Sequence, residues 1–338
     1  MVHGPMSAGA IQAFAMPAEE FVGALYRICL GRPADPAGMA VWAELIRSTG
    51  DPTRVLLGIL ESHEYAARPV PGVLPDCARE ASRALSGLNR RVRVVDVGAQ
   101  SLGAGSHPYD ALLNFCNPEV IGFDPLSERL RERAETEAAL DLTLLPYAIG
   151  DGKAHTLYVN NDDATSSLFP LNKCHNARFN HLNELRTVRT EQITTHRLDD
   201  VLPEGPVDFL KLDVQGAELM ALQGADEVLS RTAAVHCEVE FSPIYEGQPL
   251  FAAVQQHLMS RNFALIDLLV PGRYHYITPS GRIGQDRLLW ADAVYFREPA
   301  DAETRRVQAL IAATVYRKPT LAEHLMVLAE VTNSSYDA

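Results

Sequence analysis

The stretch "VDFLKLDVQGAEL", residues 207–219, decides the fold, because the apolar run of a buried strand ends there in charged residues. Lys211 and Asp213 are two residues apart, so in a strand they point to the same face. A buried charge without a partner costs several kcal/mol, which favours a paired or functional role for both side chains. Gly216 predicts the turn into a helix. Glu218 in its first turn is equally explained by the helix dipole.

The pattern around this stretch predicts an α/β protein. From residue 91 onward, short apolar runs alternate with longer helical segments, which is typical of a parallel sheet covered by helices on both faces. A hairpin-like segment, 270–286, separates the last two runs and predicts that the final strand is antiparallel. The seven runs are residues 92–99, 119–125, 142–151, 207–213, 233–241, 263–269 and 292–298.

The N-terminal part has a different pattern, which predicts a small all-α domain. Helical spacing of apolar residues, with Asp35-Pro36 and Asp51-Pro52 as helix starts, predicts three short helices. Prolines 69, 71 and 75 then interrupt helical structure. We therefore expect a flexible N-terminus (1–16), a helical bundle (17–67), a proline-rich linker with a lead-in helix (68–90), the main domain (91–300) and a helical tail (301–338).

Composition excludes several classes of protein. A net charge of −13 argues against a nucleic-acid-binding surface and favours a small-molecule ligand. The five cysteines form no CxxC pair, as in a reduced cytoplasmic protein. We see no secretion signal and no apolar run of the ~20 residues that a membrane span needs. The expectation is a cytoplasmic protein, with a homodimer through its N- or C-terminal helices as one arrangement.

The ends of the first three runs suggest a nucleoside site, because ligands bind outside the carboxyl ends of parallel strands. "VVDVGAQ" places Asp96 and Gly98 at the first end, and "VIGFDP" places Asp124 at the second. A carboxylate at the second end can accept hydrogen bonds from ribose hydroxyls. "LPYAIGD" supplies Ala148, which leaves room for an adenine ring, and Asp151, which is expected to contact the adenine amino group.

The fifth run, "AAVHCEVEF", places His236, Glu238 and Glu240 on one face of an interior strand. Glu240 lies nearest the carboxyl end and is expected to face Asp213 across the cleft. The two carboxylates would hold a divalent metal, orient a substrate hydroxyl or act as general base. His236 lies deeper and is more often a hydrogen-bonded core histidine. Tyr245, a few residues later, is a candidate wall of the substrate pocket.

The insertion between the third and fourth runs offers further candidates. Ser166, Ser167, His175 and His181 lie in it, and a loop at this place can fold over the site. The two histidines are candidate bases or substrate contacts, although surface histidines are common.

These motifs, taken in order with "AIGD", "RLDDVL", "FLKLDVQGAELMALQGA" and "VHCEVEFSPIYEGQPLF", resemble the FkbM family of S-adenosyl-methionine-dependent methyltransferases. The resemblance covers residues 91–298, and its most specific element is K-x-D-x-x-G-A-E at 211–218. It implies the class I methyltransferase fold, a Rossmann-like seven-stranded sheet with an antiparallel last strand. The N-terminal helices are similar to a small domain of unknown function found in bacterial proteins concerned with surface glycans and adhesins.

The resemblance also implies roles for single residues. Asp96, Gly98 and Gln100 would line the methionine and ribose part of the cofactor, and Asp124 would bind the ribose. Ala148 and Asp151 would flank the adenine. The family motif D-x-G-A-N-x-G has Gln100 in place of Asn here, with the next glycine displaced to Gly103, and Gln215 replaces the more usual Glu.

The resulting hypothesis is an O-methyltransferase that acts on a hydroxyl of a saccharide, a glycan precursor or a polyketide-like molecule. Asp213, Glu240 and Lys211 would be the catalytic group, with Glu238, Tyr245, His175 and His181 near the substrate. A divalent metal on Asp213 and Glu240 stays open. The alternatives are a nicotinamide-dependent oxidoreductase, which lacks a GxGxxG motif here, and a non-catalytic glycan-binding or scaffold protein.

Overall fold

The computed structural model describes residues 17–26, 34–49, 52–60, 62, 74–100, 107–137 and 140–334. The chain divides into two compact units, residues 1–71 and 72–338. The predicted flexible N-terminus (1–16) lies outside the described residues.

The described residues of the first unit form three helices: α1 (Ala18–Leu25), α2 (Pro36–Thr49) and α3 (Thr53–Leu60). The backbone N–H of Gly38 donates to Asp35 Oδ1 at 2.8 Å, so Asp35 caps α2 as its place before Pro36 indicated. One residue or more from each helix contributes to a small apolar core. Its fully buried members include Val22, Ala43, Val55 and Ile59.

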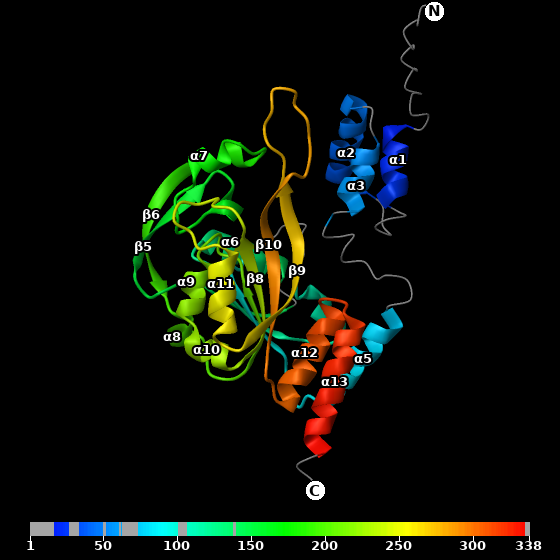
Figure 1. The fold of residues 1–338 in the computed structure, drawn as a ribbon, viewed down its shortest axis with the longest axis vertical. Coiled ribbons are helices and arrows are strands. Elements are labelled where there is room, and N and C mark those ends of the chain that lie inside the picture. The colour runs from blue at the N-terminus through cyan, green and yellow to red at the C-terminus, as the bar shows by residue number, and fades with distance from the viewer. Residues whose placement is uncertain are drawn as a thin grey trace, which may run out of the picture. The chain divides into compact units, whose positions relative to one another are not determined.

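A seven-stranded sheet in the order β3-β2-β1-β7-β8-β10-β9 is the centre of the second unit (Figure 1). β10 pairs antiparallel with both β8 and β9, and the pairs β3–β2, β2–β1, β1–β7 and β7–β8 are parallel. The predicted antiparallel last strand is therefore confirmed. The strands are β1 (Arg93–Val97), β2 (Glu119–Phe123), β3 (Asp141–Leu145), β7 (Val207–Leu212), β8 (Thr232–Glu240), β9 (Phe263–Tyr274) and β10 (Arg287–Arg297).

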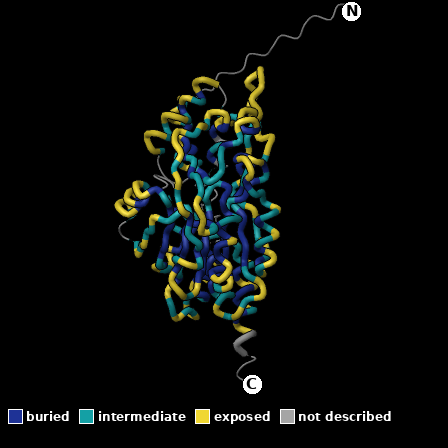
Figure 2. The backbone as a smooth tube through the Cα atoms, turned by 90° about the vertical axis from the view of Figure 1, so that its left-hand side faces the viewer, coloured by how far each residue is buried: buried dark blue, intermediate teal, exposed yellow. Residues whose placement is uncertain are grey.

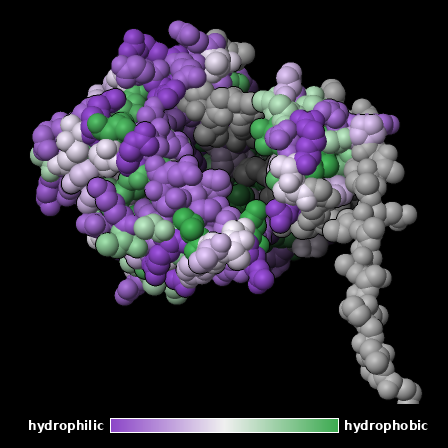
Figure 3. All heavy atoms as spheres, turned by 90° about the horizontal axis from the view of Figure 1, so that it is seen from above, coloured by the Kyte–Doolittle hydropathy of each residue, from purple (hydrophilic) through white to green (hydrophobic). Residues whose placement is uncertain are grey.

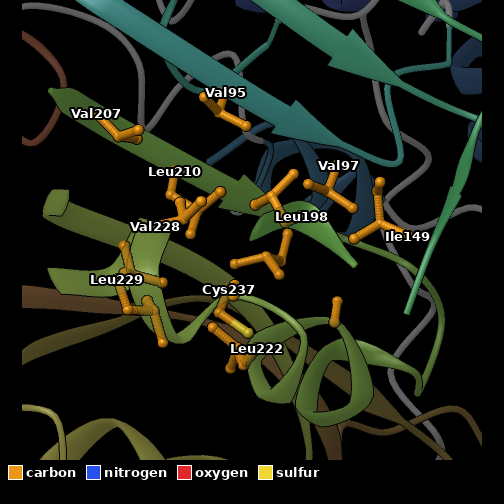
Figure 4. Close-up of a cluster of buried hydrophobic side chains, with 14 of the residues drawn as sticks. Val95, Val97, Ile149, Leu198, Val207, Leu210, Leu222, Val228, Leu229 and Cys237 are labelled. Carbon is orange, nitrogen blue, oxygen red and sulfur yellow. The ribbon is translucent and has the colours of Figure 1, made fainter. Parts of the chain in front are cut away.

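Helices cover both faces of this sheet, and each face has its own apolar core. On one face, side chains of β1, β7 and β8 pack against α8 (Leu198–Val201), α9 (Glu218–Gln223), α10 (Asp226–Ser230) and α11 (Phe251–Met259). Figure 4 shows part of this cluster, with Leu222 and Leu229 near strand residues such as Leu210 and Cys237. Buried residues run along the middle of the unit and exposed ones along its periphery (Figure 2).

The opposite face is covered by α5 (Leu74–Ser86), α12 (Ala302–Thr314) and α13 (Pro319–Ser334), which pack together. Their apolar side chains share a core with Val94, Phe209, Ala234 and Val294 of the sheet. The two amphipathic segments of the predicted tail thus lie on the sheet of their own chain. Whether a second subunit also binds there stays a prediction.

The insertion forms a separate three-stranded sheet in the order β4-β6-β5. Its strands are β4 (Ala148–Ile149), β5 (Ala154–Asn160) and β6 (Thr187–His196). The third apolar run is therefore split: residues 141–145 belong to the large sheet, and Ala148 belongs to the small one. The helix α6 (Ser127–Thr136) follows β2. Short helical turns complete the fold: η2 (Asp110–Asn114), η3 (Asp163–Thr165), α7 (Lys173–Asn176) and η4 (Leu182–Glu184).

On the face drawn in Figure 3, hydrophobic residues occur in small separate groups among hydrophilic ones. Among the described residues, no helix combines the length and the apolar composition that crossing a membrane requires.

Candidate active site

The carboxyl end of β7, where the sequence predicted a site, begins with a buried charge network. Strand register places Lys211 beside Asp96 of β1 and His236 of β8. Lys211 Nζ lies 3.2 Å from Asp96 Oδ1 and 3.6 Å from Asp213 Oδ2. Arg133 Nη1 of α6 lies 2.7 Å from Asp96 Oδ2. We call Asp96, Tyr109, Arg133 and Lys211 the Asp96 network.

The charges in the Asp96 network compensate one another. Asp96 is fully buried, and burial alone would raise its pKa, but Lys211 and Arg133 lower it to about 2. Burial likewise opposes the charge of Lys211, yet Asp96 and Asp213 raise its pKa to about 12. Tyr109 donates a hydrogen bond to Asp96 at 2.7 Å. Lys211 is therefore a fixed cation, so it cannot serve as a general base at neutral pH.

Lys211 also holds the glycine turn after β1. Its Nζ donates to the carbonyl oxygen of Gly98 at 2.9 Å, while the N–H groups of Gly98 and Ala99 donate to the carbonyl of Phe123. Gly98 has φ +84°, and a Cβ there would lie 1.9 Å from the carbonyl oxygen of Asp213. Only glycine fits this turn, which brings β1 and β7 together at the edge of a cavity.

The first cavity lies at the ends of β1, β2 and β7 and encloses about 100 Å³. Of the predicted cofactor residues, it is lined by Gly98, Gln100, Asp124 and Ala148, and also by Asp213. Apolar walls suited to a base complete it: Phe123, Leu126, Tyr147, Ile149, Leu157 and Leu168 are among its lining residues.

Asp124 has the features expected of a ribose ligand. It is buried, and burial raises its pKa to about 6, although a hydrogen bond from the Leu126 N–H (2.8 Å) and one from Gln100 act against this. Its carboxylate lines the cavity and can accept further hydrogen bonds. The side chains that line this cavity therefore fit an adenosine, because a carboxylate can accept hydrogen bonds from the ribose diol and apolar walls can contact the base.

Two predicted cofactor residues lie elsewhere. Asp96 does not line the cavity, because its carboxylate is turned into the Asp96 network. Asp151 does not line it either: its Oδ1 lies 2.7 Å from His155 Nε2, and the N–H of Lys153 donates to the same oxygen. The structure thus does not bring Asp151 to the expected adenine site, since the local turn uses its carboxylate.

A second cavity of about 210 Å³ adjoins the first, and both are lined by Ala164 and Gln215. Glu238, Glu240 and Tyr245 line it, as do residues of the insertion and of the β9–β10 hairpin. The other lining residues are Thr165, Leu182, Leu185, Ile244, Tyr274 and Trp290. Asp213 therefore faces one cavity and Glu240 the other.

Gln215 joins the two cavities through its side chain. Its Nε2 donates to Asp213 Oδ1 at 2.9 Å and to Glu238 Oε2 at 2.8 Å, and its Oε1 lies 2.9 Å from the hydroxyl of Tyr245. Its backbone has φ +54°, a region that a non-glycine side chain rarely adopts. Ser167 of the insertion donates to the Gln215 carbonyl at 2.6 Å. The insertion thus closes over the cavities and fixes this residue.

The carboxyl groups of Glu218, Glu238 and Glu240 lie together, with oxygens within 4.8 Å of one another. We call them the glutamate cluster. Burial, with repulsion from neighbouring carboxylates, raises the pKa of Glu238 and Glu240 well above the usual range. Burial also raises the pKa of Glu218 to about 7, although the N–H groups of Val214 and Gly216 donate to its Oε1. Asp213, which the sequence analysis left open as a metal ligand together with Glu240, is not a member of this group.

The three histidines that the sequence analysis considered lie outside both cavities. His175 is buried, with Nε2 3.0 Å from Ser242 Oγ, and burial lowers its pKa. His181 is exposed at the start of η4. His236 packs against Phe209 and Tyr316 as a core histidine, with Nδ1 3.2 Å from the Tyr316 hydroxyl. The structure therefore does not bring His175 or His181 to the cavities as the sequence analysis expected.

Several residues of the site were not foreseen. Arg133 and Tyr109 complete the Asp96 network, and Gln215 was noted only as a departure from the family motif. Trp290 and Tyr274 line the second cavity from β10 and β9. A signal existed for Trp290, which is one of only two tryptophans and follows the apolar "LL" of the last strand.

Comparison with known proteins gives one curated relative, a 2-O-methyltransferase, NoeI, of Sinorhizobium fredii. It is 30% identical over 150 residues, which is 42% of this chain and 62% of the relative's length. The chain thus matches less than two thirds of that protein.

Among solved structures, a magnesium protoporphyrin IX methyltransferase from Synechocystis with bound S-adenosyl-methionine is 13% identical. The alignment covers 85% of this chain and 100% of that one, with a TM-score of 0.33. The N-terminal domain of EvdMO1 with bound S-adenosyl-homocysteine is 10% identical, over 70% of this chain and 84% of that one, with a TM-score of 0.32. These scores are low, so the fold assignment rests on the strand order above.

Two family models match the chain. A domain of unknown function, DUF4214, matches residues 7–68, in agreement with the resemblance noted for the N-terminal helices. The methyltransferase FkbM domain matches residues 96–265, half of the chain, and includes the carboxyl ends of β1, β2, β7 and β8. The chain therefore belongs to the FkbM methyltransferase family.

Proposed function

We propose that the protein transfers a methyl group from S-adenosyl-methionine to a hydroxyl of a saccharide, a glycan precursor or a polyketide-like molecule. The observation that carries the proposal is the pair of adjoining cavities at the carboxyl edge of the sheet, both lined by Gln215. The relative's printed activity, 2-O-methylation, supports a hydroxyl acceptor. Membership of a methyltransferase family argues against the oxidoreductase and scaffold alternatives.

The first cavity would hold the cofactor. Asp124 would accept hydrogen bonds from the ribose hydroxyls, and the apolar walls would contact the adenine. When bound, S-adenosyl-methionine supplies a methyl group on a sulfonium sulfur, an electrophile for a hydroxyl oxygen. Lys211 acts as a positioning residue, because it holds the carbonyl of Gly98 and the carboxylate of Asp213 at the rim of this cavity.

Glu240 is the base that we propose for the acceptor hydroxyl. Its side chain lines the second cavity, and burial raises the pKa of its carboxyl group well above the usual range, which makes the ionised carboxylate a stronger proton acceptor. Glu238 would accept a hydrogen bond from a neighbouring hydroxyl, while Gln215 donates to its other side. Placing the hydroxyl beside the cofactor supplies much of the remaining acceleration.

Calorimetry with S-adenosyl-homocysteine tests the cofactor part of the proposal. The native protein should bind it, and Asp124→Ala should bind at least about tenfold more weakly, because buried hydrogen bonds to a charged group contribute about 1.5–3 kcal/mol. Glu128→Ala, an exposed position in α6, is the matched control and should bind normally. No binding by the native protein would overturn the proposal.

A second measurement tests the transfer itself. Radiolabelled methyl groups from S-adenosyl-methionine should appear in a hydroxyl-bearing acceptor, and the product's ether should resist mild base, unlike a methyl ester. Label that is lost in mild base would identify a carboxyl acceptor and contradict O-methylation of a hydroxyl.

A further inference from the structure

Trp290 occupies a defined place beside the glutamate cluster. Strand pairing puts it directly across from Glu240 of β8 on one side and from Gly272 of β9 on the other. All three therefore lie in one row across the sheet, on the same face. The pairing of β10 with β9 shifts register before and after Trp290, and irregularities of this kind change the direction of side chains next to binding sites.

Gly272 gives the indole ring its position. A Cβ built at Gly272 would lie 2.2 Å from Cε2 and 2.4 Å from Nε1 of Trp290, so the ring packs directly on the backbone of β9. Any other residue at 272 would displace it. Tyr274, two residues further along β9, lines the same cavity. The hairpin therefore presents a fixed aromatic surface to the acceptor cavity.

The charged side chains that line the second cavity are all acidic. Its described lining residues include two carboxyl side chains, Glu238 and Glu240, and no Lys, Arg or His. Glu218 lies within the same cluster of oxygens. An anionic group on the ligand would face these carboxylates without a cationic partner, which is unfavourable in a buried place. Neutral hydroxyls or an ammonium group would instead donate hydrogen bonds to them.

We infer that the second cavity is a subsite for a non-anionic sugar ring, neutral or amino-substituted, whose apolar face stacks on Trp290. Glu238 and Glu240 then bind hydroxyl groups on the ring edge. This inference rests on the proposed function and narrows it: the acceptor is a saccharide rather than a polyketide-like molecule, and it carries no phosphate or carboxylate beside the methylated hydroxyl. Trp290, Gly272 and Glu238 become specificity-determining residues.

Tryptophan fluorescence reports this binding directly. The chain has two tryptophans, so Trp42→Phe in the full-length protein leaves Trp290 as the only one. The protein is saturated with S-adenosyl-homocysteine and titrated with methyl glucoside, methyl galactoside, methyl fucoside, methyl glucosaminide, methyl glucuronide and methyl galacturonide. At least one neutral or amino glycoside should change the Trp290 emission saturably. The matching uronide should bind about tenfold more weakly or worse.

Two variants identify the cause of that preference. Glu238→Gln keeps the size of the side chain and removes its charge. The ratio of the dissociation constants of the uronide and the neutral glycoside should therefore fall severalfold. Gly272→Ala should weaken binding of the neutral glycoside by displacing the indole, with S-adenosyl-homocysteine affinity unchanged. Glu246→Gln, an exposed position outside the cavity, is the matched control and should leave the preference as in the native protein.

Equal binding of uronide and neutral glycoside, or no saturable change with any glycoside in protein that binds S-adenosyl-homocysteine, would overturn the inference and leave the cofactor part of the proposed function standing. Loss of S-adenosyl-homocysteine binding in the native protein would overturn the proposed function itself. Native-like glycoside binding by Gly272→Ala would contradict the role of the indole, since that variant's folding is checked independently by its cofactor affinity.

Discussion

Two buried charged clusters lie at the carboxyl edge of the same sheet and differ in how their charges are compensated. In the Asp96 network, one carboxylate lies between Lys211 and Arg133, and its pKa is lowered to about 2. In the glutamate cluster, three carboxyl groups lie within 4.8 Å of one another, and their pKa values are raised. Glu218 and Glu240 are buried, as Asp96 is, and Glu238 is half-buried, so burial alone does not explain the difference. The presence or absence of a cationic partner among the described residues does.

The difference separates a scaffold from a reactive site. A carboxylate held by two cations keeps one protonation state across the working pH range, and the Asp96 network accordingly fixes β1, β7 and α6 together. Carboxyl groups that are buried without a cationic partner have raised pKa values, so their carboxylates are stronger proton acceptors, a property that favours general base catalysis. Lys211 belongs to the first group and Glu240 to the second, although the sequence analysis assigned both to catalysis.

The largest expected effect on stability comes from removing the ion pair between Arg133 and Asp96. Arg133→Met leaves Asp96 buried with one cation fewer, and loss of one partner of a buried ion pair costs about 3–5 kcal/mol. Urea unfolding of the full chain measures the change. Arg131→Met, whose side chain is 73% exposed, is the control and should change the free energy of unfolding by less than about 0.5 kcal/mol. Equal effects of the two substitutions would contradict the role of the network.

A substitution of Glu240 in the glutamate cluster should instead lower activity without lowering stability. Glu240→Gln removes the proposed base and should slow methyl transfer to the best glycoside acceptor about 10²-fold or more. Stability at pH 8 should not fall, because the variant loses a carboxylate that repels its neighbours. Affinity for S-adenosyl-homocysteine, measured by calorimetry, should stay within about twofold of the native value. Transfer at the native rate would assign the base to another residue, with Asp213 the next candidate.

A smaller effect is expected at the residue that links the two cavities. Gln215→Glu replaces the N–H donors to Asp213 and Glu238 with a carboxylate oxygen, so the free energy of unfolding should fall by about 1–3 kcal/mol at pH 8. The loss should shrink at pH 5, where the added carboxyl group is protonated among its acidic neighbours. Gln256→Glu, an exposed position in α11, should show no such pH dependence. A pH-independent loss at position 215 would point to backbone strain instead.

The comparison also explains how far the sequence could predict the molecule. Periodicity and strand-end residues predicted the seven-stranded sheet and put Asp213 and Glu240 at its carboxyl edge, because strand alternation depends only on local pattern. The partners of these groups depend on contacts between distant elements. Arg133 looks like an ordinary helix arginine, four residues before Glu137, and only the packing of α6 turns it toward Asp96.

The position of Asp151 outside the first cavity has a similar cause. Asp151 follows a strand-like run, and the sequence does not reveal that this run divides between two sheets. Beyond the division, the carboxylate serves a local turn with His155 and Lys153. Trp290 was missed because its role depends on Gly272, a partner eighteen positions away that is fixed only by the hairpin register. The local sequence pattern thus predicts helices and strands, whereas the register between strands determines which side chains meet in the site.

The smallest expected effect is a change in how the free energy of unfolding depends on pH, and it tests whether Glu218 lacks a compensating cation. Burial raises the pKa of Glu218 from 4.5 to about 7, so between these values the folded protein binds more protons than the unfolded chain. The contribution of this carboxyl group to the free energy of unfolding is therefore greatest below pH 4.5 and falls as the pH rises to about 7. Glu218→Gln keeps an oxygen acceptor for the Val214 and Gly216 N–H groups and removes the titration.

The stability of Glu218→Gln relative to the native protein should therefore increase with pH, by up to about 2.5 kcal/mol between about pH 5 and about pH 8. Urea unfolding at a series of pH values measures this difference. Glu227→Gln removes the same charge from an exposed position of α10 and serves as the control. If both variants differ from the native protein by a constant amount at every pH, then Glu218 is compensated in the folded protein, and the contrast between the two clusters reduces to the Glu238–Glu240 pair.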